Sequence, residues 1–313
     1  MGSGIRPGRA AFRPGPPVES RVLTTDRRFR FGRFERAFTE TRVMGIVNVT
    51  PDSFSDGGRY LAPRAAIAHA ESLIAQGADI LDIGGESTRP GATPVPWQEE
   101  RQRLLPVLRA LVADAGVPIC VDTRQPAMMR EALDLGVDMI NDVTGLHSAE
   151  ARRVLAGYPD VAVCLMHMRG EPQTMQVRPE YQDAVGEIRR FFEQRLATCA
   201  QAGIDAERLL LDPGFGFGKL LNHNLSLING LSRLAVLGLP LLVGVSRKRM
   251  IGELLGDLTQ PRIGASVVAG LYAAQQGAHV LRVHDVQETV GALRVWRRLA
   301  AGSVAPPDCR AAF

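Results

Sequence analysis

Polar side chains follow most of the short apolar runs in this chain of 313 residues. A short apolar run closed by turn residues is typical of a buried strand, so these side chains stand where strands are expected to end. Any one of them has an ordinary structural explanation, such as capping the next helix, but chance accounts poorly for so many. Together they predict an active site at the strand ends. In chain order they are Asn48, Glu86, Asp122, Asn141 with Asp142, His167, Asp212, Ser246 with Lys248, and Arg282 with His284.

One set of these groups suits a flat, nitrogen-rich ligand. Asp122, Asn141 and Asp212 carry acceptor oxygens, and the asparagine adds a donor. A carboxylate accepts two parallel N–H bonds from a guanidine-like edge, the reverse of an arginine–carboxylate fork. We therefore expect these three side chains to bind the edge of a heterocycle.

A second set suits an anion. Arg282 offers a planar fork for phosphate oxygens, and an Arg-x-His sequence after the last strand lies where barrels often bind phosphate. Lys248 adds positive charge, although a lone His284 is more often a structural residue. Asn48 offers a neutral oxygen, and Mg²⁺ often takes few protein ligands and completes its shell with water and substrate phosphate. These residues predict a phosphate site, at which Asn48 cannot hold a metal alone but is compatible with such an ion.

The glycine-rich stretch Leu209–Lys219 raises the question of what it holds. Such loops often bind phosphate, but the P-loop pattern requires glycine where this chain has Pro213 and serine or threonine where it has Leu220. Glycines allow close approach of the backbone, and Phe217 offers a flat apolar ring. This combination favours one wall of a heterocycle pocket, with a purely structural turn as the alternative.

Two polar loops, Thr50–Gly58 and Glu86–Gly91, lie just beyond expected strand ends. Their glycine and proline content suits segments that close over a site and exclude water. An exposed connection explains the same composition, so both interpretations stay open.

The elements that must position these groups alternate between strand and helix. Eight strand-like runs separated by helical patterns predict an α/β fold, a single (β/α)8 TIM barrel with its chemistry at the carboxyl ends of the strands. A doubly wound open sheet is the alternative, because a count of strands cannot establish closure. A short β-hairpin or lid is predicted over 29–38, and a long helix over 181–202. The runs are 43–48, 80–84, 119–122, 139–142, 161–166, 209–212, 241–245 and 280–283.

Charge separates the ends of the chain from its body. Residues 1–42 contain ten arginines and four acidic residues, and the remaining 27 basic and 29 acidic residues leave the body near neutral. A nucleic-acid partner is therefore not expected, because it requires a basic face on the folded part. We predict a disordered basic leader over 1–22, a single barrel domain over 23–302 and a flexible tail over 303–313.

The four cysteines, Cys120, Cys164, Cys199 and Cys309, show no C-x-x-C spacing. Two of them lie in apolar runs, where a reduced cysteine behaves as a small hydrophobic residue. Neither a run long enough to cross a bilayer nor a secretory signal is present, so we expect a cytoplasmic protein without a membrane partner.

The ordered motifs resemble those of the dihydropteroate synthase family, across nearly all of residues 25–300. The resemblance implies an alkyl- or aryl-transferring enzyme of folate biosynthesis that condenses 6-hydroxymethyl-7,8-dihydropterin diphosphate with 4-aminobenzoate. It also implies Mg²⁺, a homodimer and membership of an enzyme class that sulfonamides target. The matching stretches are Met44–Gly58, Asp82–Gly91, Val121–Thr123, Ile140–Asp142, Leu165–Met168, Asp212–Lys219, Ser246–Lys248 and Arg282–His284.

The resemblance also implies roles for single residues. The pterin ring is expected to contact Asp122, Asn141, Met166, Asp212, Phe217 and Lys248. Diphosphate is expected to contact Asn48, Arg282 and His284, with Asn48 as the ligand of Mg²⁺. Aminobenzoate is expected to contact Phe54, Thr88, Arg89, Pro90 and Ser246. Asp122, Lys248 and Arg282 are expected to take part in catalysis.

Two other functions fit part of the pattern. A methyltetrahydrofolate-dependent methyltransferase shares the heterocycle contacts but has no use for Arg282 and His284 as an anion site. A non-catalytic pterin-binding paralogue shares the fold, although the loop residues Phe54, Thr88 and Arg89 are all retained here.

Overall fold

The computed structural model describes residues 25–50, 58–87, 95–171 and 174–301. The predicted leader over 1–22 and the predicted tail over 303–313 lie outside these ranges, so both stay predictions. Among the described residues, no helix is long and apolar enough to cross a membrane.

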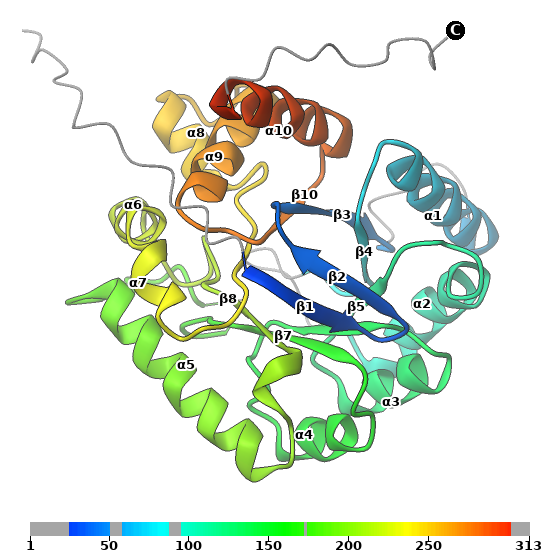
Figure 1. Ribbon diagram of the computed structural model, residues 1–313. Helices are drawn as coiled ribbons and strands as arrows, with labels where there is room; N and C mark the ends of the chain where they lie inside the picture. Colours follow the sequence, from blue (N-terminus) through cyan, green and yellow to red (C-terminus); the bar gives the residue numbers. More distant parts are fainter. Residues whose placement is uncertain (1–24, 51–57, 88–94, 172–173, 302–313) are drawn as a thin grey trace, which may run out of the picture.

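Eight parallel strands form a closed ring, and the predicted barrel is confirmed (Figure 1). Seven neighbouring pairs form a continuous ladder from β8 round to β9, and a parallel bridge between Leu211 and Leu241 joins its two ends. The open doubly wound sheet is therefore wrong, because its edges would stay unpaired. The strands are β3 (Arg42–Asn48), β4 (Ile80–Gly84), β5 (Ile119–Asp122), β6 (Met139–Asp142), β7 (Ala162–Met166), β8 (Leu209–Asp212), β9 (Leu242–Val243) and β10 (Val280–Val283).

Helices surround the ring on its outside (Figure 1). The predicted long helix starts at Ala184 rather than at 181, because the Asp183 side chain accepts a hydrogen bond from the backbone N–H of Gly186 and caps it there. The helices are α1 (Gly58–Ala75), α2 (Trp97–Leu111), α3 (Pro126–Asp134), α4 (Ala149–Ala156), α5 (Ala184–Gln201), α6 (Leu221–Asn229), α7 (Leu231–Ala235), α8 (Arg249–Leu255), α9 (Ile263–Gln275) and α10 (Val286–Ala301), with a 3-10 turn, η2, at Ala206–Arg208.

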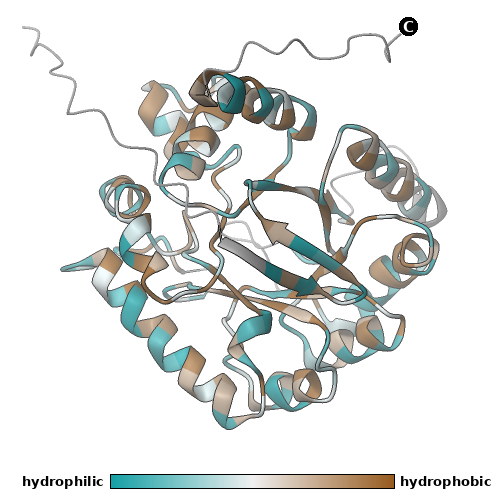
Figure 2. Ribbon diagram, in the orientation of Figure 1, coloured by the Kyte–Doolittle hydropathy of each residue, from teal (hydrophilic) through white to brown (hydrophobic). Residues whose placement is uncertain are grey.

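The alternation of side chains along each strand sorts them between the barrel interior and the helices. In β4, Leu81 and Ile83 pack with the helix-facing core, whereas Ile80 belongs to a separate cluster inside the barrel. Since side chains of a strand point to opposite faces in turn, Asp82 faces the interior as well. Figure 2 shows the mainly hydrophobic strands and the hydrophilic residues that collect on outer helices such as α5. The carboxyl half of the interior is therefore where the polar side chains meet.

The N-terminal hairpin, β1 (Thr25–Phe31) with β2 (Phe34–Phe38), closes the other end of the barrel. Phe29, Phe31 and Phe38 are buried and join one cluster with first residues of strands such as Ile80 and Val280. The predicted hairpin is confirmed, but it is not a lid over the polar end. Figure 1 shows it lying across the barrel.

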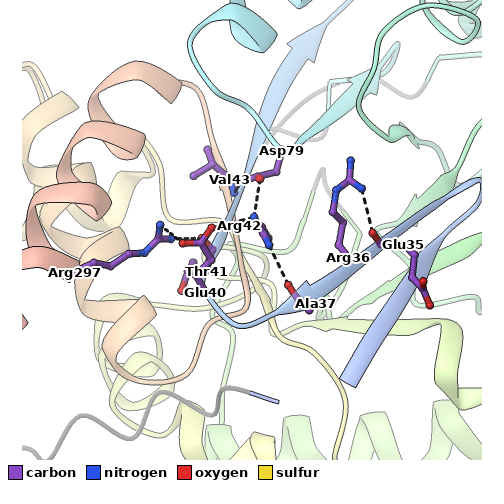
Figure 3. Close-up of polar contacts among 9 residues, drawn as sticks. All are labelled: Glu35, Arg36, Ala37, Glu40, Thr41, Arg42, Val43, Asp79 and Arg297. Atoms are coloured by element: carbon purple, nitrogen blue, oxygen red, sulfur yellow. Dashed lines mark hydrogen bonds and ion pairs between the residues drawn. The ribbon is translucent and has the colours of Figure 1, made fainter. Parts of the chain in front are cut away.

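Polar contacts fix this hairpin to the first barrel strand and the last helix (Figure 3). The Arg42 guanidinium donates to Glu40 at 3.0 Å, to Asp79 at 3.2 Å and to the carbonyl of Ala37 at 3.1 Å. Arg297 of α10 donates to the carbonyl of Thr41 at 2.7 Å. The amino end of the barrel is thus held by packing and ion pairs, and its carboxyl end is left for chemistry.

Candidate functional site

Arg282 of β10 joins two carboxylates across the carboxyl half of the barrel. Its Nε donates to Oδ2 of Asp82 on β4 at 2.5 Å, and its Nη2 donates to Oδ2 of Asp122 on β5 at 2.9 Å. In the ring order, β3 and β4 lie between β10 and β5, so these bonds span the interior. The predicted anion-binding arginine and heterocycle-binding aspartate are therefore in direct contact.

Burial and neighbouring charge set the protonation of this group. Burial raises the pKa of Asp122 to about 8, with a further increase from the negative charge of Asp82 and an opposing effect of Arg282. Burial disfavours charge on Arg282, but the two carboxylates raise its pKa above the usual value. The guanidinium therefore stays charged, and the raised pKa of Asp122 allows this carboxyl to exchange a proton near neutral pH.

Asp212 and Lys248 form the neighbouring part of the site. Asp212 is buried, and its Oδ1 accepts from the backbone N–H of Gly214 at 2.7 Å. Lys248 donates to the carbonyl of Phe215, and its Nζ lies 4.4 Å from the centre of the Phe217 ring. Burial lowers the pKa of Lys248 to about 8, while the charge of Asp212 acts in the opposite direction.

Asn141 presents an unsatisfied acceptor. The residue is buried at the end of β6, and among the described residues its Oδ1 has no hydrogen-bond partner. A buried amide oxygen without a partner is costly, so such an atom commonly marks the place of a ligand donor. Met166, buried at the end of β7, pairs in register with Asp212 and supplies apolar surface beside it.

Ser246 and His284 link the ends of the last two strands. The Ser246 hydroxyl oxygen lies 3.0 Å from Nδ1 of His284 and accepts from the backbone N–H of His284 at 3.2 Å. Between Ser246 and Lys248, Arg247 has a φ of 56°, a left-handed conformation that is uncommon for a residue with a side chain.

Contacts of Arg247 hold this turn in place. Its guanidinium forms a two-point ion pair with Asp285, and its backbone N–H donates to the Ser266 hydroxyl at 2.9 Å. Asp285, just before α10, thus uses its side chain for an ion pair with this turn. The pair ties the Ser246–Lys248 segment to the end of β10.

Hydrogen bonds from the Lys219 side chain hold the glycine-rich loop in its conformation. The buried Nζ donates to the carbonyls of Gly214 at 2.8 Å and Phe217 at 3.0 Å, and lies 2.9 Å from Nδ1 of His167. Burial and the nearby Lys219 charge lower the pKa of His167 to about 2, so the neutral ring can accept this bond. Since the Lys219 amine donates to carbonyls of its own loop and burial lowers its pKa, the stretch does not present a cation to an anion.

The conformation of this loop depends on glycine at Gly214. Its φ is 69°, and a Cβ there would lie 1.9 Å from the carbonyl oxygen of His167. The loop can therefore pass close over the end of β7 only without a side chain at this position.

Some strand-end residues do not face the site. His167 supports the loop from below, and Asp142 accepts from the backbone N–H groups of Thr144 and Leu146 at 2.8 and 3.1 Å. The Glu86 carboxylate is also occupied, because its Oε1 accepts hydrogen bonds from Nη2 of Arg124 at 3.0 Å and from the backbone N–H of Val95 at 3.2 Å.

Asn48 stands at the end of β3, partly buried and paired in register with Gly84. In the part of the chain that the structure describes, no group of three or more His, Cys, Asp or Glu residues is arranged to hold a metal ion. A single amide oxygen fits a hydrated Mg²⁺ that takes its other ligands from water and a substrate phosphate. The predicted aminobenzoate residues Phe54, Thr88, Arg89 and Pro90 lie outside the described residues.

Asp82 is the functional residue that the sequence reasoning missed. It stands in the middle of Ile80–Gly84 rather than at its end, which is why it was not counted with the strand-end groups. The available signal was a carboxylate inside an otherwise apolar strand, an expensive placement unless a partner neutralises it.

Comparisons with known proteins agree with this geometry. The profile of the pterin binding enzyme family matches residues 44–284. A dihydropteroate synthase of Neisseria meningitidis is 53% identical over 274 residues, covering 86% of this chain and 96% of that protein. A Xanthomonas albilineans dihydropteroate synthase solved with 4-aminobenzoic acid superposes with a TM-score of 0.83 at 49% identity, covering 90% of this chain and 100% of that one. The same enzyme with 7,8-dihydropteroate gives 0.79 at 46%, with the same coverage.

A second buried acid, Glu100 of α2, lies directly behind the site. Its side chain packs against Gly85, because a Cβ added to that glycine would lie 3.1 Å from Cγ of Glu100. Among the described residues, neither of its carboxyl oxygens has a hydrogen-bond partner in acceptable geometry. Burial raises its pKa from 4.5 to about 7, and the charge of Glu86 adds to this, whereas Thr123, Arg124 and Arg103 favour the charged form.

This raised pKa predicts a pH-dependent stability. A carboxyl whose pKa is higher in the folded state contributes stability below its unfolded pKa of 4.5, and that contribution is lost as the pH rises through about 7. At roughly 1.4 kcal/mol per pKa unit, Glu100→Gln should be more stable than the original protein by up to about 3 kcal/mol at pH 8. The difference should shrink towards pH 5, as measured by urea unfolding.

The exposed neighbour Glu99 provides the control for this measurement, since its side chain is 52% exposed. Glu99→Gln should show no comparable trend between pH 5 and pH 8. A stability difference for Glu100→Gln that stays constant over this range contradicts the prediction.

Proposed function

The chain belongs to the dihydropteroate synthase family of pterin-binding enzymes, and we propose how the carboxyl end of its barrel performs that family's transfer reaction. In this reaction, 6-hydroxymethyl-7,8-dihydropterin diphosphate condenses with 4-aminobenzoate to give 7,8-dihydropteroate and diphosphate. The observation that carries the assignment to this end is the contact of Arg282 with Asp82 and Asp122, which puts an anion-binding cation beside a heterocycle-binding carboxylate.

The pterin ring is assigned to the pocket between Asp122, Asn141, Asp212 and Lys248. The unsatisfied Oδ1 of Asn141 and the oxygens of Asp212 offer acceptors to the N–H groups of a pterin edge. Met166 and Phe217 supply apolar surface, which suits the faces of a flat ring. Lys248 and Arg282 offset two of the three buried carboxylates, and the raised pKa of Asp122 allows that third group to be protonated, so an uncharged heterocycle can enter without leaving an unpaired charge.

The diphosphate is assigned to Arg282 and His284 at the end of β10. Arg282 offers a planar donor group, and His284 stands two residues further along the chain. We assign Mg²⁺ to Asn48, where it would neutralise charge on the diphosphate when bound. The positions of these residues support this assignment, since the strands β3 and β10 that carry them are adjacent.

The aminobenzoate is assigned to Ser246 together with Phe54, Thr88, Arg89 and Pro90. Ser246 lies beside His284, so an amine bound there would approach the carbon that carries the leaving group. The contact of Glu86 with Val95 connects residues on either side of the second polar loop.

We propose a dissociative, SN1-like displacement. Neutralising the diphosphate makes it a better leaving group, and the pterin then carries positive charge at its exocyclic carbon. That charge lowers the pKa of nearby Asp122 and Asp212 and favours their ionised forms, which stabilise it in return. The arylamine is a sufficient nucleophile for such a cation, so no strong protein base is required.

Release of diphosphate tests the proposed reaction. It should be rapid only when dihydropterin diphosphate and 4-aminobenzoate are both present, because transfer needs the amine to trap the cation. Removing Mg²⁺ with a chelator should slow it, and adding Mg²⁺ back should restore it. Binding of pterin without any release would instead identify a non-catalytic binding protein.

Asp212→Ala tests the pterin pocket. Losing a buried hydrogen-bond partner costs roughly 1–3 kcal/mol, so pterin affinity should fall about five- to 150-fold. Isothermal titration calorimetry with 6-hydroxymethyl-7,8-dihydropterin measures this directly. An affinity equal to that of the original protein would remove Asp212 from the pocket.

We also propose that the chain forms a homodimer through α9 and α10. Large apolar side chains stand exposed on these two helices, among them Val268 at 66%, Val295 at 60% and Leu299 at 77% exposure. Exposed apolar side chains that gather on neighbouring helices favour a protein interface. Light scattering should give twice the mass of the chain, and Val268→Lys should shift it towards monomer. A monomeric original protein at micromolar concentration would contradict this.

A further inference from the structure

Asp82 is placed to act on the site without touching a substrate. The residue is fully buried, and Oδ2 is taken by Arg282. It lies two residues before the end of β4 at Gly84, or about 7 Å below the rim at the usual rise per strand residue. A pterin or diphosphate at the rim therefore meets Arg282 and Asp122 first.

The two carboxylates around Arg282 differ in what else they can do. Asp122 ends its strand, and its side chain is 11% exposed, whereas Asp82 is completely enclosed. When Asp122 turns to a pterin edge, its contact with Nη2 of Arg282 is released. The bond between Asp82 and Nε can persist, because a ligand at the rim does not reach it.

Stability alone does not explain a carboxylate at this position. Among the described residues, Oδ1 of Asp82 has no hydrogen-bond partner in acceptable geometry, and the nearby thiol of Cys120 is only a weak donor to this carboxylate. Burying an ion pair usually gains little over apolar side chains of the same volume, and a poorly satisfied oxygen adds to the cost. A carboxylate buried at such a cost points to a task other than packing.

We propose that Asp82 is a positioning residue that anchors Arg282 through Nε, so that the guanidinium stays aimed at the diphosphate while Asp122 binds the pterin. A guanidinium is planar and rigid, so an anchor at Nε fixes the orientation of that plane and with it the directions of the two terminal nitrogens. Losing the anchor leaves the arginine free to follow Asp122 or to leave the rim. This inference rests on the proposed assignment of diphosphate to Arg282.

The test compares Asp82→Asn and Asp82→Glu with the original protein. For Asp82→Asn, we expect the inhibition constant of inorganic diphosphate and the KM for dihydropterin diphosphate to rise about tenfold or more. The KM for the aminobenzoate substrate and the affinity for bare dihydropterin should change less than threefold. Asp82→Glu keeps the charge and should recover part of the diphosphate affinity.

Asp138 provides a matched control at the other end of the barrel. It is also buried, and its Oδ1 accepts from Nε of Arg33 at 3.1 Å. Asp138→Asn should lower the stability of the fold to a similar degree but leave diphosphate inhibition unchanged. If both variants alter diphosphate inhibition equally, Asp82 has only a structural role.

A double-mutant cycle separates positioning from direct binding. In an Arg282→Ala background, Asp82→Asn should not weaken diphosphate binding further, because there is no guanidinium left to anchor. The same change should raise the stability of that background, since it removes an unpaired buried charge. An equally large loss of diphosphate affinity in both backgrounds would overturn the proposal.

The failure of this inference can be told from failure of the proposed function. If the original protein neither turns over nor binds diphosphate, the assigned reaction is wrong, and Asp82 has no arginine–diphosphate contact to support. If the original protein is active and Asp82→Asn matches it in diphosphate inhibition, only the role of Asp82 is wrong.

Discussion

The bond network of Arg282 with Asp82 and Asp122 is the constraint on which the site depends. Asp212 and Lys248 lie beside it, so several charges share one low-dielectric interior. Such charges are tolerated only in mutual contact, because an isolated buried ion is far too costly. The mutual neutralisation of these charges keeps Arg282 charged and sets the pKa of Asp122 near neutral pH. The contacts that allow these charges to be buried are therefore the same contacts that we assign to substrate binding.

The two ends of the barrel are specialised for different tasks. The aromatic hairpin β1–β2 fills the amino end, where Phe31 and its neighbours cover the first residues of the strands. Because that end is closed and tied to α10 through Arg297, the strands have a fixed base. Polar residues at the carboxyl end then need little adjustment to meet.

The glycine-rich loop shows how a local pattern changes meaning once its neighbours are known. Its glycines and terminal lysine suggested an anion, but Lys219 is buried and donates to the carbonyls of its own loop. We assign the positive charge of the site instead to Lys248 and Arg282, which lie later in the chain. Gly214 allows the loop to pass close to the carbonyl of His167, and Asp212 is the part of the stretch that we assign to the pterin.

The sequence by itself determined the alternation of strands and helices, because apolar strand runs and intervening helices are local patterns, and it placed Asp122, Asn141 and Arg282 at or next to strand ends, but it left the closure of the sheet open. It could not determine which strand-end groups face one another. His167, Asp142 and Glu86 have the same local appearance but are taken by Lys219, backbone N–H groups and Arg124. Which groups meet was decided only by the closed ring, because it places β10 across the interior from β4 and β5. In that arrangement Asp82, which lies within an apolar strand, contacts Nε of Arg282.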